Sequence, residues 1–479
     1  MNSSSASQRL SIGEKVAYGL GDTASNFFFQ AFNFFLVYYY TDVFGLSPAA
    51  VGTMMLFTRC LDAVMDPIMG AIADRTQTRW GKYRPYLLWV AVPYGLIGYL
   101  MFSNPTLSPA GKLLFAYLTY SLMWVAYTAI NIPYSALMGV MSSSSEDRTS
   151  LSTFRFALAF TGSFLISTAV LPLKNLLGRL AAGHGGVVSS GSGSAVITPV
   201  IDQAAGFKYT MAIFAVVSVA LFLITFLKTK ERVHPPVEQK NSLGADLRDL
   251  RDNKPWLVLF IVAFFTLANT GVRNATTLYY FKYNVGDENK ATLFMSTAAL
   301  AFVFGALATK AFLKLADRRK LMIYLTIINA AAMASFYFID PKQTTLLLVI
   351  NTIGTFVVGP TPAIVWSLYA DTADYGEWKF GRRSTALVFS AAVFAQKVGL
   401  AVGSSMLGWA LKASHFVPNA AQTPEALQSI LLLFTLVPGG LALVSGLAII
   451  FYPLDDPRVR QIEADLKARK GEIPAAAAA

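Results

Sequence analysis

Three charged residues share one face of a strongly apolar segment near residue 60. Arg59, Asp62 and Asp66 are spaced three and four residues apart, which places them on one side of an α-helix. The helical rise separates the two carboxylates by about 6 Å along the axis, and Pro67 frees the carbonyl of residue 63 from its helical hydrogen bond. Ionised groups are costly in a bilayer, so this face predicts a site for a sodium ion or a proton. A purely structural arginine–aspartate bridge is the alternative.

Two other apolar segments carry polar side chains on a single helix face, at spacings of i, i+4 and i+8. These side chains are Asp22, Asn26 and Gln30 in the first segment, and Tyr127, Asn131 and Ser135, flanked by Thr128, in the second. Hydroxyl and amide groups can hydrogen-bond a sugar, but the same groups also join neighbouring helices inside membranes. We expect Asn26 to line a cavity, whereas the spacing leaves the role of Asp22 open.

Lone cations lie inside apolar segments of the second half of the chain. Arg273 and Lys397 each demand an anion, which an aspartate of the Asp62 segment or an acidic substrate could supply. Lys310 lies nearer the end of its segment and can extend its amine to the membrane surface. Between these cations, Gly359–Pro362 predicts a helix break that exposes backbone groups.

Composition places most of these residues in a membrane. The 479 residues are 54% hydrophobic and 14% charged, with a mean hydropathy of +0.50, whereas soluble domains are about a quarter charged. The net charge of +12 comes from short segments between apolar runs, which favours a membrane surface over nucleic acid. One cysteine, Cys60, and three histidines in apparent loops (His184, His234 and His415) exclude an internal disulfide and a Cys/His metal cluster. Neither a Ser-His-Asp nor a nucleotide motif is found, so we expect a protein that is not an enzyme.

Apolar segments long enough to cross a bilayer recur along the whole chain. We predict an all-α polytopic fold with twelve transmembrane helices, at about 16–40, 47–73, 84–103, 110–141, 150–175, 206–227, 255–284, 290–316, 319–339, 343–370, 384–412 and 427–452. The N-terminus lacks the pattern of a cleavable signal peptide, so the first segment is expected to be retained. Lysine and arginine concentrate in alternate connecting segments, which predicts cytoplasmic termini.

The chain divides into two six-helix halves. Residues 1–227 form the first half, 228–254 a charged cytoplasmic linker with a short amphipathic stretch at 243–250, and 255–479 the second half with a low-complexity tail. The pair Asp74–Arg75 ends the second segment of the first half, and Asp317–Arg318 ends the second segment of the other half. Parallel six-helix repeats are typical of the major facilitator fold.

Charged residues at the inner ends of these segments could form bridges that hold a gate shut. The candidate gating residues are Asp74, Arg75 and Arg79 in the first half, and Asp371, Asp374 and Glu377 in the second. Simple anchoring of the topology is the alternative for these charges.

The motifs in these stretches resemble the glycoside–pentoside–hexuronide:cation symporters, from about residue 10 to 455. They are Tyr18-Gly-x-Gly, Tyr38-Tyr-Tyr-Thr-Asp42, Arg59-x-x-Asp-Ala-x-x-Asp-Pro67, Arg79-Trp-Gly-Lys-Tyr-Arg-Pro85, Asn131-Ile-Pro-Tyr134 and Asp371-Thr-Ala-Asp-Tyr-Gly-Glu-Trp378. The chain is more similar to the xyloside and glycoside branch than to the melibiose permeases.

The resemblance implies a cation site and a sugar site. The cation residues would be Asp62, Asp66 and Thr128, with the two aspartates as ligands if the ion is sodium, and the sugar residues Asn26, Tyr127, Asn131, Arg155 and Lys397. The helical spacing of polar residues adds Gln30 to the predicted sugar site, and the lone cation inside an apolar segment adds Arg273. Amides replace the aspartates of melibiose permeases at 26 and 131, Ser25 replaces a lysine, and Ser135 and Pro362 replace tryptophans, which argues against galactosides. A less negative cavity with Arg273 would tolerate an acidic glycoside.

These observations together predict a secondary transporter in a bacterial inner membrane. We expect symport of sodium or a proton with a glycoside, such as a pentoside or a glucuronide, by alternating access in a monomer without a further cofactor. A sodium-dependent lysolipid symporter and an uncoupled sugar facilitator are the alternatives. A sugar sensor is disfavoured because the inner segments are too short to hold a signalling domain.

Overall fold

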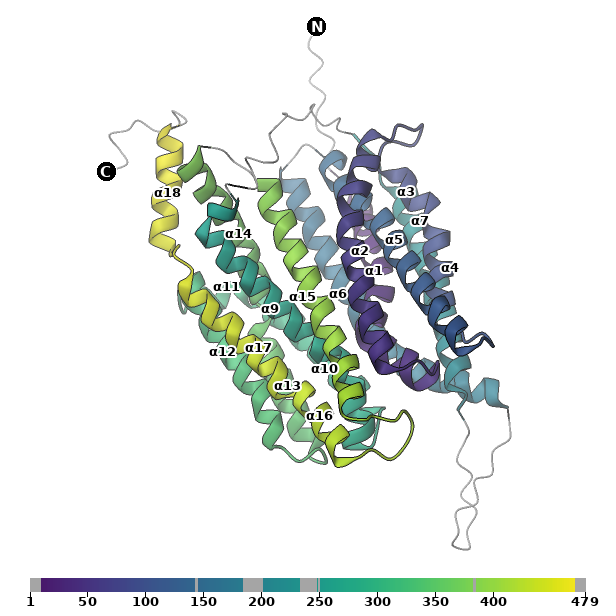
Figure 1. Cartoon of the computed structure of the whole chain (residues 1–479). Helices are drawn as coiled ribbons and strands as arrows, with labels where there is room; N and C mark the ends of the chain where they lie inside the picture. The colour runs from purple at the N-terminus through teal and green to yellow at the C-terminus, as the bar shows by residue number, and fades with distance from the viewer. Residues whose placement is uncertain are drawn as a thin grey trace, which may run out of the picture. The chain divides into compact units, whose positions relative to one another are not determined.

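The computed structural model describes most of the chain as helices joined by short loops (Figure 1). The described residues are 10–142, 145–183, 201–232, 248, 250–381 and 385–469. Among them there is no β-strand, and Thr78 and Gly81 form an isolated bridge. The linker stretch 233–247, His184 and His234 of the sequence predictions lie outside these residues, as does the alanine-rich tail. The predicted all-α fold is confirmed.

The helices of the first half follow the predicted apolar segments. They are α1 (Ile12–Ala31), α2 (Pro48–Arg75), α3 (Arg84–Trp89), α4 (Ala91–Met101), α5 (Pro109–Met141), α6 (Ser145–Ala182) and α7 (Gln203–Lys228). The side chains of Ser11, Ser47 and Ser108 accept a hydrogen bond from a first-turn amide of α1, α2 and α5, respectively. These caps satisfy amides that a helix cannot pair internally, and they set where each helix begins.

The second half repeats this arrangement and adds a final helix. Its helices are α9 (Lys254–Tyr279), α10 (Lys290–Leu307), α11 (Thr309–Phe312), α12 (Arg318–Ser335), α13 (Thr344–Val358), α14 (Thr361–Phe380), α15 (Thr385–Ala413), α16 (Pro424–Phe434), α17 (Leu436–Ala448) and α18 (Asp456–Arg469). The predicted break at Gly359–Pro362 is present, because α13 ends at Val358 and α14 begins at Thr361. The segment predicted at 290–316 is also interrupted, between α10 and α11.

Nine helices of the described residues are long and apolar enough to cross a membrane. The helices at three predicted segments fall short of that measure for identifiable reasons. α3 and α4 are a single apolar segment interrupted at Val90, and α2 carries Arg59, Asp62 and Asp66 in its middle. α1 begins with Glu14 and Lys15. Helical segments therefore stand at all twelve predicted places, and the exceptions include the helix with the most intramembrane charge.

The chain forms two compact units. Unit 1 is Met1–Val237 with Glu288–Ser296 and Phe416–Ala421, and unit 2 is Glu238–Asp287, Thr297–His415 and Gln422–Ala479. In unit 1, α1 packs against both α6 and α7, and α2 packs against α5. These neighbours bring the polar faces of α1, α5 and α6, and the charged face of α2, into the interior of the unit.

In unit 2, α15 packs against α9, and α12 packs against α17. The C-terminal helix α18 lies beside the C-terminal end of α14 (Figure 1), where Val459, Ile462 and Leu466 are buried in the core of the unit. The sequence prediction treated this region as a tail. The spacing of the three apolar residues, three and four positions apart, is the signal that indicates an amphipathic helix.

Candidate functional site

The two aspartates of α2 meet one hydroxyl group of α5. Thr128 Oγ1 lies 2.7 Å from Asp62 Oδ1 and 3.0 Å from Asp66 Oδ1. Asp62 is 1% exposed and Thr128 is 2% exposed, whereas Asp66 is partly exposed. Because a hydroxyl carries one hydrogen, it can fully satisfy only one of two carboxylates. A proton on one aspartate, or a cation among the oxygens of the three side chains, is compatible with this arrangement.

This cluster differs from a conventional metal centre. In the part of the chain that the structure describes, no three His, Cys, Asp or Glu side chains gather as metal ligands. Carboxylate and hydroxyl oxygens are nonetheless the ligands that hard cations prefer over nitrogen or sulfur. The donor set of Asp62, Asp66 and Thr128 therefore fits a sodium ion or a proton and is unsuited to a transition metal.

The third charge of this helix face is held by aromatic rings. The guanidinium of Arg59 lies 3.6 Å from the centroid of the Trp124 ring and 6.0 Å from that of Phe29. Arg59 is 4% exposed, and stacking on an aromatic face partly compensates a cation for the loss of water. The Asp62 carboxylate accepts its hydrogen bond from Thr128, so α5 supplies a partner to both charges.

A chain of amides and hydroxyls joins α1 to α6. Gln30 Nε2 donates to Ser163 Oγ at 2.9 Å, and Ser163 Oγ donates to Asn26 Oδ1 at 3.3 Å. On the α5 side, Ser25 Oγ donates to Asn131 Oδ1 at 2.8 Å. All of these side chains except Ser25 are partly exposed. The structure thus brings three predicted sugar residues, Asn26, Gln30 and Asn131, together with two serines.

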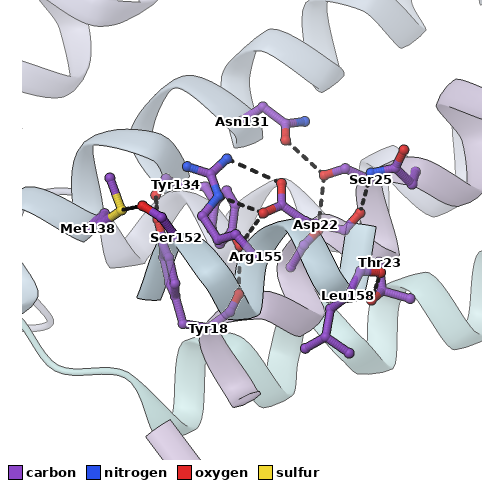
Figure 2. A network of polar contacts seen from close by, with 12 residues as sticks. Tyr18, Asp22, Thr23, Ser25, Asn131, Tyr134, Met138, Ser152, Arg155 and Leu158 are labelled. Carbon is purple, nitrogen blue, oxygen red and sulfur yellow. Dashed lines mark hydrogen bonds and ion pairs between the residues drawn. The ribbon is translucent and has the colours of Figure 1, made fainter. Parts of the chain in front are cut away.

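A partly exposed ion pair lies next to this chain. Arg155 of α6 donates to both oxygens of the Asp22 carboxylate of α1, at 2.6 Å from Nε and 3.2 Å from Nη2. Figure 2 shows Tyr134 on the same carboxylate, to which its hydroxyl donates at 3.1 Å. Tyr18 and Tyr134 also stack, with centroids 4.7 Å apart. Asp22, whose role the sequence left open, is the partner that orients Arg155.

Tyr127 connects the two sites. Its ring stacks on Phe29 with centroids 5.9 Å apart, and lies 5.2 Å from the Trp124 ring that carries Arg59. Its backbone carbonyl accepts a hydrogen bond from Asn131 Nδ2 at 3.0 Å. The residue therefore contacts the rings around Arg59 and, through its carbonyl, Asn131 of the amide chain.

Two predicted sugar residues belong to unit 2. Arg273 of α9 donates from Nη2 to Asn351 Oδ1 of α13 at 2.7 Å. Its guanidinium lies 5.2 Å from the ring centroid of Phe336 and 5.5 Å from that of Phe434. Lys397 lies on α15 with a partly exposed side chain. Arg273 thus keeps its positive charge among a neutral amide and two aromatic rings.

One predicted gating residue of the second half, Asp371, belongs to an ion-pair cluster. Arg318 of the repeated Asp–Arg pair bridges to Asp371 at 2.9 Å and to Asp456 of α18 at 2.7 Å. Asp374 and Glu377 follow on α14 with partly exposed side chains. Arg318 therefore ties the start of α12 to α14 and to the C-terminal helix.

The predicted gating residues of the first half are arranged differently. Arg75 ends α2 and is exposed, and Arg79 is exposed with its guanidinium 4.4 Å from the centroid of the Trp80 ring. Asp74 lies in α2, and its side chain is outside the described set. The charged residues that follow the second segment of each half thus make different contacts: Arg79 lies over a ring, whereas Arg318 forms ion pairs.

The loop that follows α2 binds a glutamate that the sequence reasoning missed. The Glu231 carboxylate, just beyond α7, accepts hydrogen bonds from the backbone amides of Lys82, Tyr83 and Arg84 at 2.7 to 2.9 Å. Gly81 adopts φ +111°, and a Cβ at this position would lie 2.6 Å from the Glu231 carboxylate. The glycine of the Arg-Trp-Gly-Lys-Tyr-Arg motif is thus required by both backbone angle and space.

The start of α6 is fixed to α1 at the same end of unit 1. Lys15 Nζ lies 2.9 Å from Asp147 Oδ1, and Ser142 Oγ lies 3.3 Å from Asp147 Oδ2. The hydrogen bond from Lys15 holds the pKa of Asp147 below its usual range. Asp147 therefore stays ionised at neutral pH and anchors the helix end.

A fully buried lysine lies at the other end of α6. Lys174 has no exposed surface, and its Nζ lies 2.7 Å from Glu288 Oε1. Tyr38 Oη donates to Glu288 Oε2 at 3.1 Å. Because a buried ammonium needs a carboxylate partner, this pair explains why Glu288–Ser296 groups with unit 1.

Comparison with known proteins identifies relatives along nearly the whole chain. The family described as MFS/sugar transport protein matches residues 17–456. YagG of Escherichia coli (strain K12), named for glycoside/cation symport, is 36% identical over 98% of this chain and 99% of its own. The isoprimeverose transporter of Lactiplantibacillus pentosus is 31% identical over 96% of this chain and 92% of its own. The glucuronide carrier protein homolog of Escherichia coli (strain K12) is 31% identical over 97% of both chains.

Solved structures agree on the fold. The crystal structure of a D-xylose-proton symporter matches 94% of this chain and 98% of its own, with a TM-score of 0.62 and 13% identity. At that identity the likeness concerns the fold alone. The motifs, the helical repeat and the family match lead to one assignment: the chain belongs to the MFS/sugar transport family of membrane transporters and, within it, to the glycoside–pentoside–hexuronide:cation symporters.

Proposed function

We propose that this protein couples the movement of a cation to the uptake of a glycoside by alternating access. The observation that carries the proposal is the shared hydroxyl of Thr128, within hydrogen-bonding distance of both Asp62 and Asp66. Two carboxylates that converge on one hydroxyl gather oxygen ligands and negative charge at one point, which favours a sodium ion or a proton. The cation site is therefore Asp62, Asp66 and Thr128.

The glycoside binds beside this site. Asn26, Gln30 and Asn131 offer amide groups, Tyr127 offers an aromatic ring, and Arg155 is oriented by Asp22 at the end of the same interior. Amides can both donate to and accept from sugar hydroxyls. Because Tyr127 contacts the ring that holds Arg59 and lies one position before Thr128, cation binding and sugar binding act on neighbouring turns of α5.

The predicted sugar residues of unit 2 are Arg273 and Lys397, and Arg273 would select for an acidic group. Its guanidinium is held by a neutral amide and two rings, so a carboxylate ligand would add a charge-assisted hydrogen bond. The substrate class is a glycoside of pentose or hexuronic acid type. A protein named as a glucuronide carrier homolog and one named as an isoprimeverose transporter are equally similar to this chain.

The charge distribution supports cytoplasmic termini and a place in the bacterial inner membrane. In that orientation Asp371, Asp374, Glu377 and the residues Asp74–Arg79 lie at the inner ends of the helices. The Arg318 cluster, which joins α12, α14 and α18, is then an inner bridge that opening must rearrange.

The first test is Asp66→Asn in proteoliposomes. We expect the variant to lose glycoside accumulation driven by an inward sodium or proton gradient, because an amide cannot carry the charge that the cation balances. Exchange of labelled for unlabelled glycoside should persist, and Asp340→Asn, an exposed carboxylate of a loop, should behave as wild type. Applying each gradient alone identifies the ion. Cation-stimulated uptake that survives Asp66→Asn unchanged would refute the assignment.

The same assay separates the alternatives. A wild-type protein that exchanges glycosides but never accumulates them under either gradient would be an uncoupled facilitator. Uptake of lysolipid in preference to every glycoside would identify a lysolipid symporter.

The second test concerns Arg273. Methyl β-xyloside and methyl β-glucuronide have the same ring and differ by a carboxylate at C5. Each compound is tested as an inhibitor of glycoside uptake. We expect Arg273→Gln to weaken inhibition of uptake by the glucuronide about tenfold or more, since a hydrogen bond to a charged group is lost. Inhibition by the xyloside should be unchanged in Arg273→Gln, which would also show that this variant folds. Arg273→Lys should retain part of the preference for the glucuronide over the xyloside. Equal glucuronide inhibition in all three proteins would remove Arg273 from the site.

A further inference from the structure

A cavity lies away from the proposed sugar and cation residues, between one end of α1 and one end of α7. Its volume is about 560 Å³. The polar part of its lining is formed by Ser11, Gly13 and Glu14 at the start of α1 and by Lys228, Lys230 and Arg232 at and beyond the end of α7. We propose that this cavity binds the headgroup of an anionic phospholipid of the inner leaflet.

The charge of the cavity favours an anion. Three cations and one carboxylate line it, and Arg232 makes a bidentate pair with Glu14, at 2.8 and 3.1 Å. The pair holds the guanidinium in place, while Lys228 and Lys230 remain exposed on the same side. The lining also includes the first turn of α1, where the helix dipole attracts negative charge.

The other part of the lining is apolar. Val16, Ala17 and Leu20 of α1 and Ile224 of α7 form it, and Ile224 is 39% exposed. Thr225 Oγ1 donates to the Ala17 carbonyl at 2.8 Å, which fixes the two helices to each other at this level. The small side chain of Ala17 leaves the space open.

A cavity with one basic part and one apolar part matches the structure of a phospholipid. A basic rim leads into an apolar wall on helices that span the membrane, so a phosphate headgroup and the first carbons of an acyl chain would each meet their preferred surface. A free phosphate ion would gain nothing from the apolar part. The predicted topology places this end of α1 and α7 at the cytoplasmic leaflet, where anionic lipids bind basic pockets between helices.

The test compares lipid binding to purified protein by native mass spectrometry. Dioleoyl phosphatidylglycerol and dioleoyl phosphatidylcholine are added in equal amounts to wild type, to Lys228→Gln/Lys230→Gln, and to Lys314→Gln/Lys320→Gln. The last variant removes the same charge from exposed lysines of unit 2. We expect the first double variant to lose about thirtyfold in preference for phosphatidylglycerol, the product of two surface lysines, and the second to keep it.

Two further arms make the result decisive. Val16→Trp fills the apolar part of the cavity, and it should reduce binding of phosphatidylglycerol while both lysines remain. Added sodium phosphate should fail to displace the lipid from wild type. Undiminished preference in Lys228→Gln/Lys230→Gln, an equal loss in the unit 2 control, unchanged binding in Val16→Trp, or displacement by free phosphate would each overturn the proposal.

Discussion

At the scale of single residues, the proposed function depends on the side chains that contact Asp62, Asp66 and Arg155. Thr128 faces two aspartates, and Arg59, which shares their helix face, is drawn to the ring of Trp124. We therefore propose that the convergence of two carboxylates on one hydroxyl favours the binding of a cation. Asp22 has the opposite role, because it neutralises Arg155 before any substrate arrives.

The hydroxyl of Thr128 should set the affinity for the coupling cation. Thr128→Val keeps the shape of the side chain and removes the oxygen, so we expect the cation concentration for half-maximal uptake to rise about tenfold or more. Thr128→Ser restores the oxygen and should remain close to wild type. If valine and serine behave alike, Thr128 acts through packing alone.

At the scale of elements, the loop between α2 and α3 is fixed by a carboxylate from the far end of the half. Glu231 accepts three backbone hydrogen bonds from residues 82–84, and Gly81 leaves the room for it. The Arg84 guanidinium strengthens this junction, because its Nη2 donates to the Phe226 carbonyl of α7 at 2.7 Å. The motif therefore works as a joint that connects α3 to α7.

Removal of the charge at this joint should lower stability. We expect Glu231→Gln to reduce the free energy of unfolding by about 1–2 kcal/mol, because the amide offers one acceptor oxygen in place of two charged ones. Thermal unfolding in detergent measures this change, with the exposed Glu425→Gln as control. Gly81→Ala should also destabilise, and the double variant should cost less than the sum of the two. Full additivity would mean that the two residues act independently.

At the scale of the whole molecule, the protein is a sugar transporter of the major facilitator superfamily. Coupled transport requires that the cation and the sugar each raise the affinity for the other. The closeness of the Thr128 cluster to Tyr127 and Asn131 along α5 gives this coupling a short physical route.

Linkage makes this coupling measurable without any substitution. If saturating cation lowers the Kd of the glycoside by some factor, saturating glycoside must lower the Kd of the cation by the same factor. Isothermal titration of purified protein gives both values. Affinities that are independent of each other would contradict coupling through binding, and would direct attention to the rate of conformational change.

Much of this protein follows from the sequence itself. Hydropathy alone predicts the helical segments, because a bilayer demands about 20 apolar residues per crossing. Local spacing alone places Asp62 and Asp66 on one face of α2, because three- and four-residue intervals are fixed by the helix. The spacing of Val459, Ile462 and Leu466 is typical of an amphipathic helix, but the sequence prediction treated this otherwise polar region as a tail.

The choice of partners was decided only by the tertiary structure. Helix packing brings the Trp124 ring to the Arg59 guanidinium and the Thr128 hydroxyl to the two carboxylates, contacts that spacing within α2 does not predict. The pairs Asp22–Arg155 and Lys174–Glu288 join residues more than a hundred positions apart. Such contacts depend on how each helix is rotated about its axis and against which neighbour it packs. Local spacing does not fix that rotation; the packing of the assembled helices does.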